Sequence, residues 1–371
     1  MIKSICFQKE WIERFRAQKA YKRINPPLVE KMIHALSLVQ HLKVQELDFI
    51  FKGGTSLILL LEKANRFSID VDIITQADQT QIEGLLDKVV SHSHFTRWQL
   101  DAPRSYQPGV PKAHYKLEYP SHFSKVGNYI LLDILFEAYH YPEIHDRPVQ
   151  SHWIETETTV LVKVPTIESI TGDKLTAFAP TTTGIQYGRG KELEIVKQLF
   201  DLNALFDGIE QMEVVAASYT AFVVKELSYR GLKLKINEVL WDTIHTCRII
   251  GFRESNKKEP DQTYYQELQV GIRSFSSHLM DGQFGLDQAV TAAAKVAYVC
   301  ALLLTGNYSP LLRYTGQDIQ SLTIINHEWN MLNKLKRLPD QSVFFYWYEC
   351  LKTLQLLESE MKERDGATIN L

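Results

Sequence analysis

Two carboxylates in one short segment are spaced to bind a cation. Asp70 and Asp72 are separated by one apolar residue in the segment Ile69–Ile74. Residues two apart on a strand point to the same face, so both carboxylates would project to one spot. Like charges at a half-buried position are costly unless a cation compensates them, and oxygen ligands suit Mg²⁺ or Mn²⁺. An Asp-x-Asp at a strand end that faces solvent would need no metal.

A glycine turn precedes this pair and could hold an anion. The turn consists of Gly53, Gly54, Thr55 and Ser56, between an expected strand and an expected helix. Glycines let the backbone approach a ligand closely, and a helix N-terminus offers unpaired N–H groups to phosphate. Thr55 or Ser56 could equally be only an N-cap.

Asp133 is the candidate third carboxylate. It lies within the apolar run Tyr129–Phe136, which reads as a central strand. A charge at such a position is costly unless it binds metal or forms a core salt bridge, and both alternatives stay open. Three carboxylates on neighbouring strands could hold two Mg²⁺ ions, one for an acceptor hydroxyl and one for a leaving pyrophosphate. Asp133 would then bind the first ion and could take the hydroxyl proton.

The elements that must position these residues fill the first half of the chain. Alternating or apolar runs predict strands, and amphipathic spacing predicts helices between them. A further helix is expected from about Thr166 and carries Asp173 and Lys174, followed by a loop at 180–190. The expected strands are 48–51, 69–75, 96–101, 113–119, 128–137 and 160–164, and the expected helices are 26–46, 55–64 and 79–91.

From Lys191 onward the pattern is almost entirely helical. We expect a basic N-terminal arm or helix at 1–25, a catalytic domain at 26–207 and an α-helical domain at 208–371, with Asp207-Gly208 as the hinge. The expected helices are 191–206, 211–228, 233–250, 261–280, 285–304 and 340–362.

Composition limits the class of protein. The net charge is −3, from 41 Lys and Arg against 44 Asp and Glu, so nucleic acid could be held only by local basic patches. The four cysteines are far apart, which argues against a zinc site or a disulfide scaffold. Charges interrupt the N-terminus and no apolar run reaches the length of a membrane span. We therefore expect a soluble, cytoplasmic protein with no membrane partner.

Two blocks of sequence resemble a known family. Lys52-Gly-Gly-Thr-Ser-Leu57, followed by Arg66-Phe-Ser-Ile-Asp-Val-Asp72, is similar to the signature of the AbiEii/AbiGii-type nucleotidyltransferase toxins of bacterial toxin–antitoxin systems. Asp173–Ala177 resembles that family's lysine-bearing helix, and Lys197–Leu202 its following acidic segment, with Gln198 in place of the usual first acid. The resemblance covers about residues 28–206.

The resemblance implies a polymerase-β-like nucleotidyltransferase core of α+β class, with a mixed sheet flanked by helices. It implies Mg²⁺-dependent transfer of a nucleoside monophosphate from an NTP to the 3′ end of tRNA, which halts growth, and a cognate antitoxin that restrains the toxin. Gly53–Ser56 would bind the triphosphate, Asp70 and Asp72 would bind metal, and Lys174 would contact phosphate.

Three cationic residues have more than one possible role under this resemblance. Arg66 would contact phosphate or neutralise the Asp70 and Asp72 pair. Arg189 and Lys191, in the glycine-rich loop, would reach the γ-phosphate or RNA, or would be ordinary surface residues.

Two other functions remain open from the sequence. The same chemistry could modify a protein hydroxyl or a small molecule, because acceptor choice would reside in the helical half and the loops. Alternatively, the fold could be a catalytically inactive module that binds a partner. The conjunction of Gly54, Asp70, Asp72 and Asp133 favours an enzyme.

Overall fold

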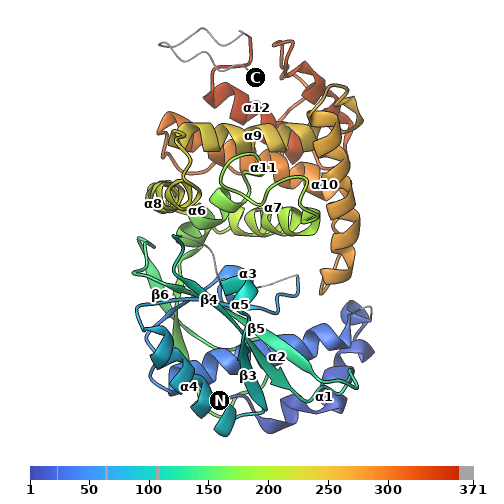
Figure 1. Ribbon diagram of the computed structural model, residues 1–371. Helices are drawn as coiled ribbons and strands as arrows, with labels where there is room; N and C mark the ends of the chain where they lie inside the picture. Colours follow the sequence, from blue (N-terminus) through green and yellow to red (C-terminus); the bar gives the residue numbers. More distant parts are fainter. Residues whose placement is uncertain (23, 63–65, 106–108, 359–371) are drawn as a thin grey trace. The chain divides into compact units, whose positions relative to one another are not determined.

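The protein forms two compact units. The structure is a computed structural model that describes residues 1–22, 24–62, 66–105 and 109–358 (Figure 1). The sheet unit contains residues 1–170 and 277–283, and the helical unit contains residues 171–276 and those from 284 onward.

The sheet unit is built on one mixed sheet of seven strands in the order β3-β4-β5-β2-β1-β7-β6. β2 runs parallel to β5, and β1 runs parallel to β7, while the other neighbours are antiparallel. The strands are β1 (Ile50–Lys52), β2 (Val71–Thr75), β3 (Arg97–Leu100), β4 (Lys112–Tyr119), β5 (Asn128–Phe136), β6 (Ile144–Pro148) and β7 (Leu161–Pro165). The mixed sheet confirms the fold class expected above, although β6 was not predicted.

Alternation along β4 and β5 gives the sheet two unlike faces. Ile130, Leu132 and Ile134 of β5 are buried in the main core, whereas Tyr129 and Asp133 on the other face are less buried. We call this other face the carboxylate face, because it carries Asp133 and its neighbours. The period-two pattern in the sequence therefore separates a packing face from a polar face.

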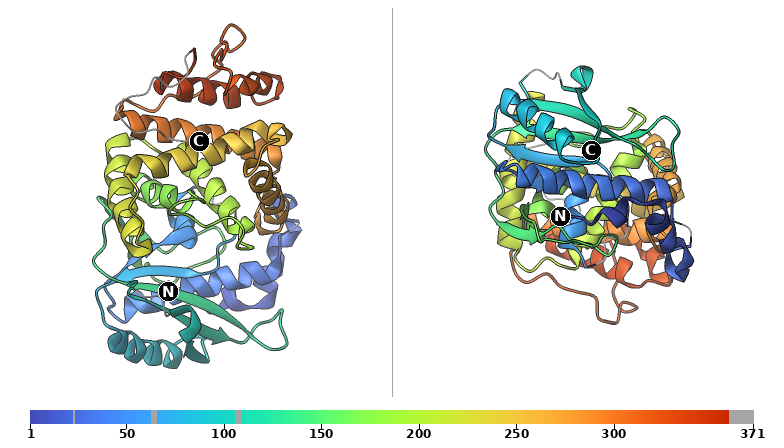
Figure 2. Two further views of the ribbon diagram at one scale, coloured as in Figure 1. Left: turned by 45° about the horizontal axis from the view of Figure 1, so that its top comes forward. Right: turned by 90° about the horizontal axis from the view of Figure 1, so that it is seen from below.

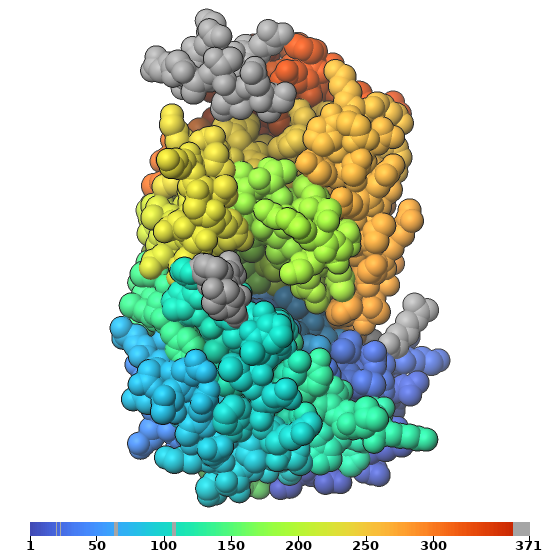
Figure 3. All heavy atoms as spheres, in the orientation of Figure 1, coloured from blue at the N-terminus to red at the C-terminus, as the bar shows by residue number. Residues whose placement is uncertain are grey.

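Helices on the packing face complete the core of the sheet unit. α2 (Pro26–Val44) lies across the strands (Figure 2) and contributes buried apolar residues to the same core as β5. α4 (Gln79–Ser91) contacts α2 and β3 and begins with a capping box at Asp78. α4 and β3 form part of the surface of this unit (Figure 3). Three shorter α-helices also lie among the described residues of this unit: α1 (Lys9–Glu13), α3 (Gly53–Leu60) and α5 (Ala102–Ser105).

The N-terminal segment belongs to this core rather than forming a separate arm. Trp11, Ile12 and Phe15 are buried, and the Trp11 indole N–H donates to the carbonyl of Trp153 at 3.0 Å. The apolar residues of this segment face the core, whereas the expectation of a basic arm rested on its number of basic residues. A segment from late in the sequence, residues 277–283, also belongs to this unit, and Phe67 donates its N–H to the His278 carbonyl at 2.8 Å. The helix expected over 261–280 therefore ends earlier, at Phe275.

The helical unit contains seven long helices in the part of the chain that the structure describes. They are α6 (Ile167–Ala177, which starts in the sheet unit), α7 (Glu192–Phe206), α8 (Met212–Arg230), α9 (Ile236–Phe252), α10 (Asp261–Phe275), α11 (Leu286–Thr305) and α12 (Ser342–Thr353). The helix expected through residue 362 ends at Thr353, and residues 359–362 lie outside the described part.

The division between the units falls at Ile170 and Thr171, whereas the composition suggested residue 207. α7 lies in the helical unit because it packs against α10 and α11, and its residues Ile195, Val196 and Leu199 are buried. A Cβ atom at Gly271 of α10 would lie 2.4 Å from the Glu192 carbonyl oxygen, so the two backbones approach closely there. The chain therefore passes from the sheet unit to the helical unit earlier than residue 207, where composition placed the change.

α11 is a core helix of this unit. Among the described residues, it alone is long and apolar enough by composition to cross a membrane, and 72% of its apolar window is buried. Burial inside a helical bundle explains its composition.

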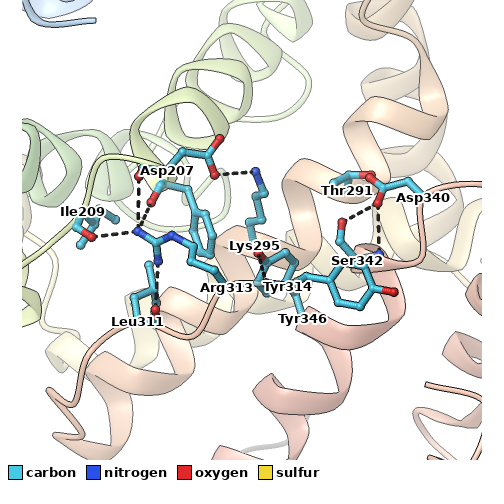
Figure 4. A network of polar contacts seen from close by, with 11 residues as sticks. Asp207, Ile209, Thr291, Lys295, Leu311, Arg313, Tyr314, Asp340, Ser342 and Tyr346 are labelled. Carbon is cyan, nitrogen blue, oxygen red and sulfur yellow. Dashed lines mark hydrogen bonds and ion pairs between the residues drawn. The ribbon is translucent and has the colours of Figure 1, made fainter. Parts of the chain in front are cut away.

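Arg313 caps the C-terminal end of α7. Its guanidinium donates to the carbonyls of Phe206 at 3.0 Å and Ile209 at 2.8 Å, and lies near Asp207 (Figure 4). Lys295 of α11 forms an ion pair with Asp207 at 3.0 Å. These cations satisfy carbonyl and carboxylate groups where the helix ends.

Replacing Arg313 should destabilise the helical unit. We expect Arg313→Ala to lower the free energy of unfolding by about 2 kcal/mol, because carbonyls at the end of α7 lose a charged donor. The free energy of unfolding of Arg313→Lys should fall between those of wild type and Arg313→Ala, since one ammonium cannot reach all of these oxygens. Urea unfolding measures the effect, and an Arg313→Ala variant as stable as wild type would contradict the capping role.

Candidate active site

A row of ionisable side chains crosses the carboxylate face. Lys52 of β1 is the register partner of Asp72, Asp72 is the partner of Asp133, and His114 of β4 is the partner of Asp133. Neighbouring strands lie about 4.8 Å apart, and register partners project to the same face. Asp70 lies two residues before Asp72, just outside β2.

Asp133 is contacted by a histidine and an arginine that the sequence did not predict. The His114 Nδ1 atom lies 2.5 Å from Asp133 Oδ1, and an Arg104 guanidinium nitrogen lies 3.7 Å from Oδ2. In the sequence, His114 stands out only as a polar residue in the alternating pattern of an expected strand. Its opposition to Asp133 depends on the antiparallel register, which cannot be read from one strand.

Gly53 brings the first turn of α3 against Asp72. Its φ of +73° is a conformation that side chains with a Cβ atom rarely adopt. A Cβ atom there would also lie 2.0 Å from Asp72 Oδ2. The turn therefore needs glycine for two independent reasons, and the second ties it to the carboxylate row.

The absence of a side chain at Gly54 lets the Arg66 guanidinium lie directly against the turn. A Cβ atom at Gly54 would lie 2.3 Å from a terminal guanidinium nitrogen of Arg66 and 2.8 Å from Ser68 Oγ. Arg66 is 8% exposed, and its guanidinium also donates to the Phe67 carbonyl at 3.2 Å. A buried cation thus lies beside the start of α3.

The hydroxyls of Thr55 and Ser56 support the turn. Both side chains are buried: Thr55 donates to the Asp70 carbonyl, and Ser56 donates to the Gly53 carbonyl at 2.9 Å. Among the described residues, α3 has no side-chain cap at Lys52. Its first N–H groups and the Arg66 guanidinium are the groups that could bind an anion here.

The donor set fits a hard divalent cation, but the carboxylates are not gathered into a metal cluster. Within the described ranges, no group of three His, Cys, Asp or Glu residues is arranged to hold a metal ion. Asp72 and Asp133 are nevertheless register partners on parallel strands, and all the candidate ligand atoms are oxygens. Further oxygen ligands, such as those of a triphosphate, would be needed to complete a site.

Lys174 lies in the helical unit and is held by a buried ion pair. Its ammonium lies 2.7 Å from Asp201 Oδ2 and 3.2 Å from Gln198 Oε1. The side chains of Lys174 and Asp201 are 6% and 1% exposed. Gln198, at the position where the resembling family has an acid, accepts a hydrogen bond from the lysine. A role of Lys174 in phosphate binding stays a prediction.

The loop 180–190 is bound to its own unit at several points. Thr182 donates its hydroxyl to Asp242 at 2.7 Å, and the Tyr187 ring stacks on Tyr264 with centroids 4.1 Å apart. Arg189 and Lys191 are exposed, and Arg189 contacts Gln186 at 3.4 Å. Their proposed contacts with phosphate or RNA stay predictions.

The fold and this site define a class: a nucleotidyltransferase core with a glycine turn beside aligned carboxylates. Comparison with protein families agrees. Residues 38–291 match the family described as "Nucleotidyl transferase AbiEii toxin, Type IV TA system". The chain therefore belongs to the AbiEii family of nucleotidyltransferase toxins, which confirms the resemblance noted in the sequence. Membership implies an NTP substrate and an antitoxin partner.

Other comparisons are more distant. No curated protein matches the chain. A crystal structure of JHP933 from Helicobacter pylori is 15% identical, covers 76% of this chain and 94% of that chain, and has a TM-score of 0.42. A putative nucleotidyltransferase from H. pylori is 17% identical over 75% of this chain and 94% of its own, also with a TM-score of 0.42. An antigenic nucleotidyltransferase-like protein from Paracoccidioides brasiliensis is 16% identical, covers 57% of this chain and 96% of that chain, and has a TM-score of 0.33.

Gly53→Ala should damage both backbone and site. The left-handed conformation alone costs a residue with a Cβ atom about 1–2 kcal/mol, and the new methyl group displaces the Asp72 carboxylate. Gly109→Ala is the matched control, because Gly109 has φ +77° and open space around its Cβ position. Urea unfolding should show a larger loss for Gly53→Ala, and equal losses would contradict the close contact with Asp72.

Lys174→Met should destabilise the helical unit by about 3–5 kcal/mol, because it removes the ammonium from a buried carboxylate. Lys197→Met is the control: its pair with Glu194 is more exposed, at 19% and 46%, and should contribute less than about 1 kcal/mol. Thermal unfolding compares the two, and similar small losses would show that Lys174 is dispensable for stability.

Proposed function

We propose that this chain is a divalent-metal-dependent nucleotidyltransferase (EC 2.7.7 type) that adds a nucleoside monophosphate to the 3′ end of a tRNA. The added nucleotide would block aminoacylation and so translation, in the cytoplasm where both substrates occur. One observation carries the proposal: Asp72 and Asp133 are register partners, and the Gly53 turn lies directly against Asp72.

The glycine turn is the proposed triphosphate site. The first N–H groups of α3 and the guanidinium of Arg66, which lies against Gly54, would bind phosphate oxygens. Thr55 would act indirectly, because its hydroxyl holds the Asp70 carbonyl. Thr55 and Ser56 would thus fix the shape of the turn and place Asp70 relative to it.

Asp70, Asp72 and Asp133 would hold Mg²⁺ or Mn²⁺, which supplies Lewis-acid stabilisation of the charge on the transferring phosphate. The acceptor 3′ oxygen forms a bond to the α-phosphorus as the bond from that phosphorus to the bridging oxygen breaks, and pyrophosphate leaves. Asp133 would take the acceptor proton. His114 and Arg104 fix the Asp133 carboxylate in position for this step.

Removing either acid of the Asp-x-Asp pair should abolish transfer. We expect Asp70→Asn and Asp72→Asn each to reduce NMP incorporation at least about 100-fold, because charge stabilisation at the phosphate is lost. The assay incubates purified protein with each labelled NTP, Mg²⁺ and total tRNA, and growth after induction is scored in parallel.

Asp146→Asn is the matched control, since Asp146 is an exposed acid on β6 of the same unit. It should retain transfer and toxicity. Persistent toxicity of Asp70→Asn and Asp72→Asn would favour a module that only binds a partner. Label found on protein or a small molecule, with none on tRNA, would contradict tRNA as the acceptor, while the proposed transfer of a nucleoside monophosphate would stand.

A further inference from the structure

An exposed aromatic ring shares the carboxylate face with Asp133. Tyr129 is 40% exposed and lies four residues before Asp133 on β5. Even spacing keeps both side chains on one face of the strand. At about 3.3 Å per residue the two positions are about 13 Å apart. A group bound to the Tyr129 ring would therefore lie near, but not at, the reacting centre.

Two lysines flank this ring. The Lys31 ammonium of α2 lies 5.0 Å from the ring centroid, and the Lys116 ammonium of β4 lies 5.6 Å from it. Burial lowers the pKa of Lys31, while the charges of Asp70 and Glu30 act in the opposite direction. Lys116 also bonds Asp101 at 2.9 Å. The ring thus lies between two cationic groups.

The acid opposite Tyr129 in the register is already paired. Glu118 is the register partner of Tyr129, but Arg97 grips its carboxylate with two bonds of 2.6 and 2.7 Å. That ion pair lowers the pKa of Glu118, which stays ionised and paired. An approaching phosphate therefore meets two lysines, one of them paired with Asp101, beside an acid that Arg97 already compensates.

Tyr129 lies on the acceptor side of the proposed site. The glycine turn contacts Asp72 at the β1 end of the row, whereas β5 and β4 extend from Asp72 in the other direction. A triphosphate at the turn leaves the Asp133 side for the group that attacks. We propose that Tyr129 stacks on an unpaired base near the 3′ end of the acceptor RNA, with Lys31 and Lys116 contacting the flanking phosphates.

The inference rests on the proposed function and specifies how its acceptor is held. A tyrosine ring accepts any base by stacking, which suits a single-stranded end, and cations beside the ring suit its backbone. The base on Tyr129 would belong to a nucleotide inside the acceptor, because the terminal hydroxyl must reach the carboxylates about 13 Å further along β5.

Steady-state transfer of a labelled nucleotide to total tRNA tests this role in the full-length protein. Tyr129→Ala should raise the KM for tRNA about 5- to 150-fold, the range expected for one base–aromatic stack. The KM for the NTP should not change. Tyr129→Phe should restore a KM near that of wild type, and Tyr129→Leu should not. Tyr139→Ala is the control, because Tyr139 is 46% exposed in the same unit.

The outcomes separate this inference from the function on which it rests. If wild type labels tRNA and Tyr129→Ala has an unchanged KM for it, the stacking role is overturned and the transferase proposal stands. If wild type labels only protein, both the tRNA acceptor and the stacking role are overturned. An equal rise in KM for Tyr139→Ala would also contradict a specific role of Tyr129.

Discussion

The register between β2 and β5 is the constraint on which the candidate site depends. Because the strands are parallel and Asp72 is the partner of Asp133, two carboxylates that are distant in sequence start from adjacent positions on one face. A slip of one residue would turn one of them into the packing core. The buried side chains of Val71, Ile73, Leu132 and Ile134 oppose such a slip, so the apolar core fixes the position of the acids.

The same core explains why the glycine turn lies where it does. β1 pairs with β2 so that Lys52, the last residue before the turn, lies opposite Asp72. The chain must then begin α3 directly beside that carboxylate, and only glycine at position 53 leaves room for it. Thr55 adds a bond to the Asp70 backbone. The groups proposed to bind an anion and the acids proposed to bind a cation thus lie within one short piece of chain.

The parts of the site that sequence reasoning reached are those encoded locally. Strand alternation singled out Asp70 and Asp72, although Asp70 lies just outside β2, and the strand-to-helix turn singled out Gly53-Gly54. Asp133 stood out as a charge in an apolar run. His114 and Arg104 did not, because their contacts with Asp133 depend on the pairing of β4 with β5 and on the short helix α5. Likewise, α7 reads as a helix, but which helices it packs against is a property of tertiary structure.

The central claim is that the three acids act together on a divalent cation once a nucleotide lies in the turn. Electron paramagnetic resonance of Mn²⁺, titrated into the full-length protein with a non-hydrolysable NTP, measures this directly. The account predicts bound Mn²⁺ in wild type and in Asp146→Asn, and strongly weakened binding in Asp72→Asn and Asp133→Asn. Unchanged Mn²⁺ affinity in both site variants would contradict it.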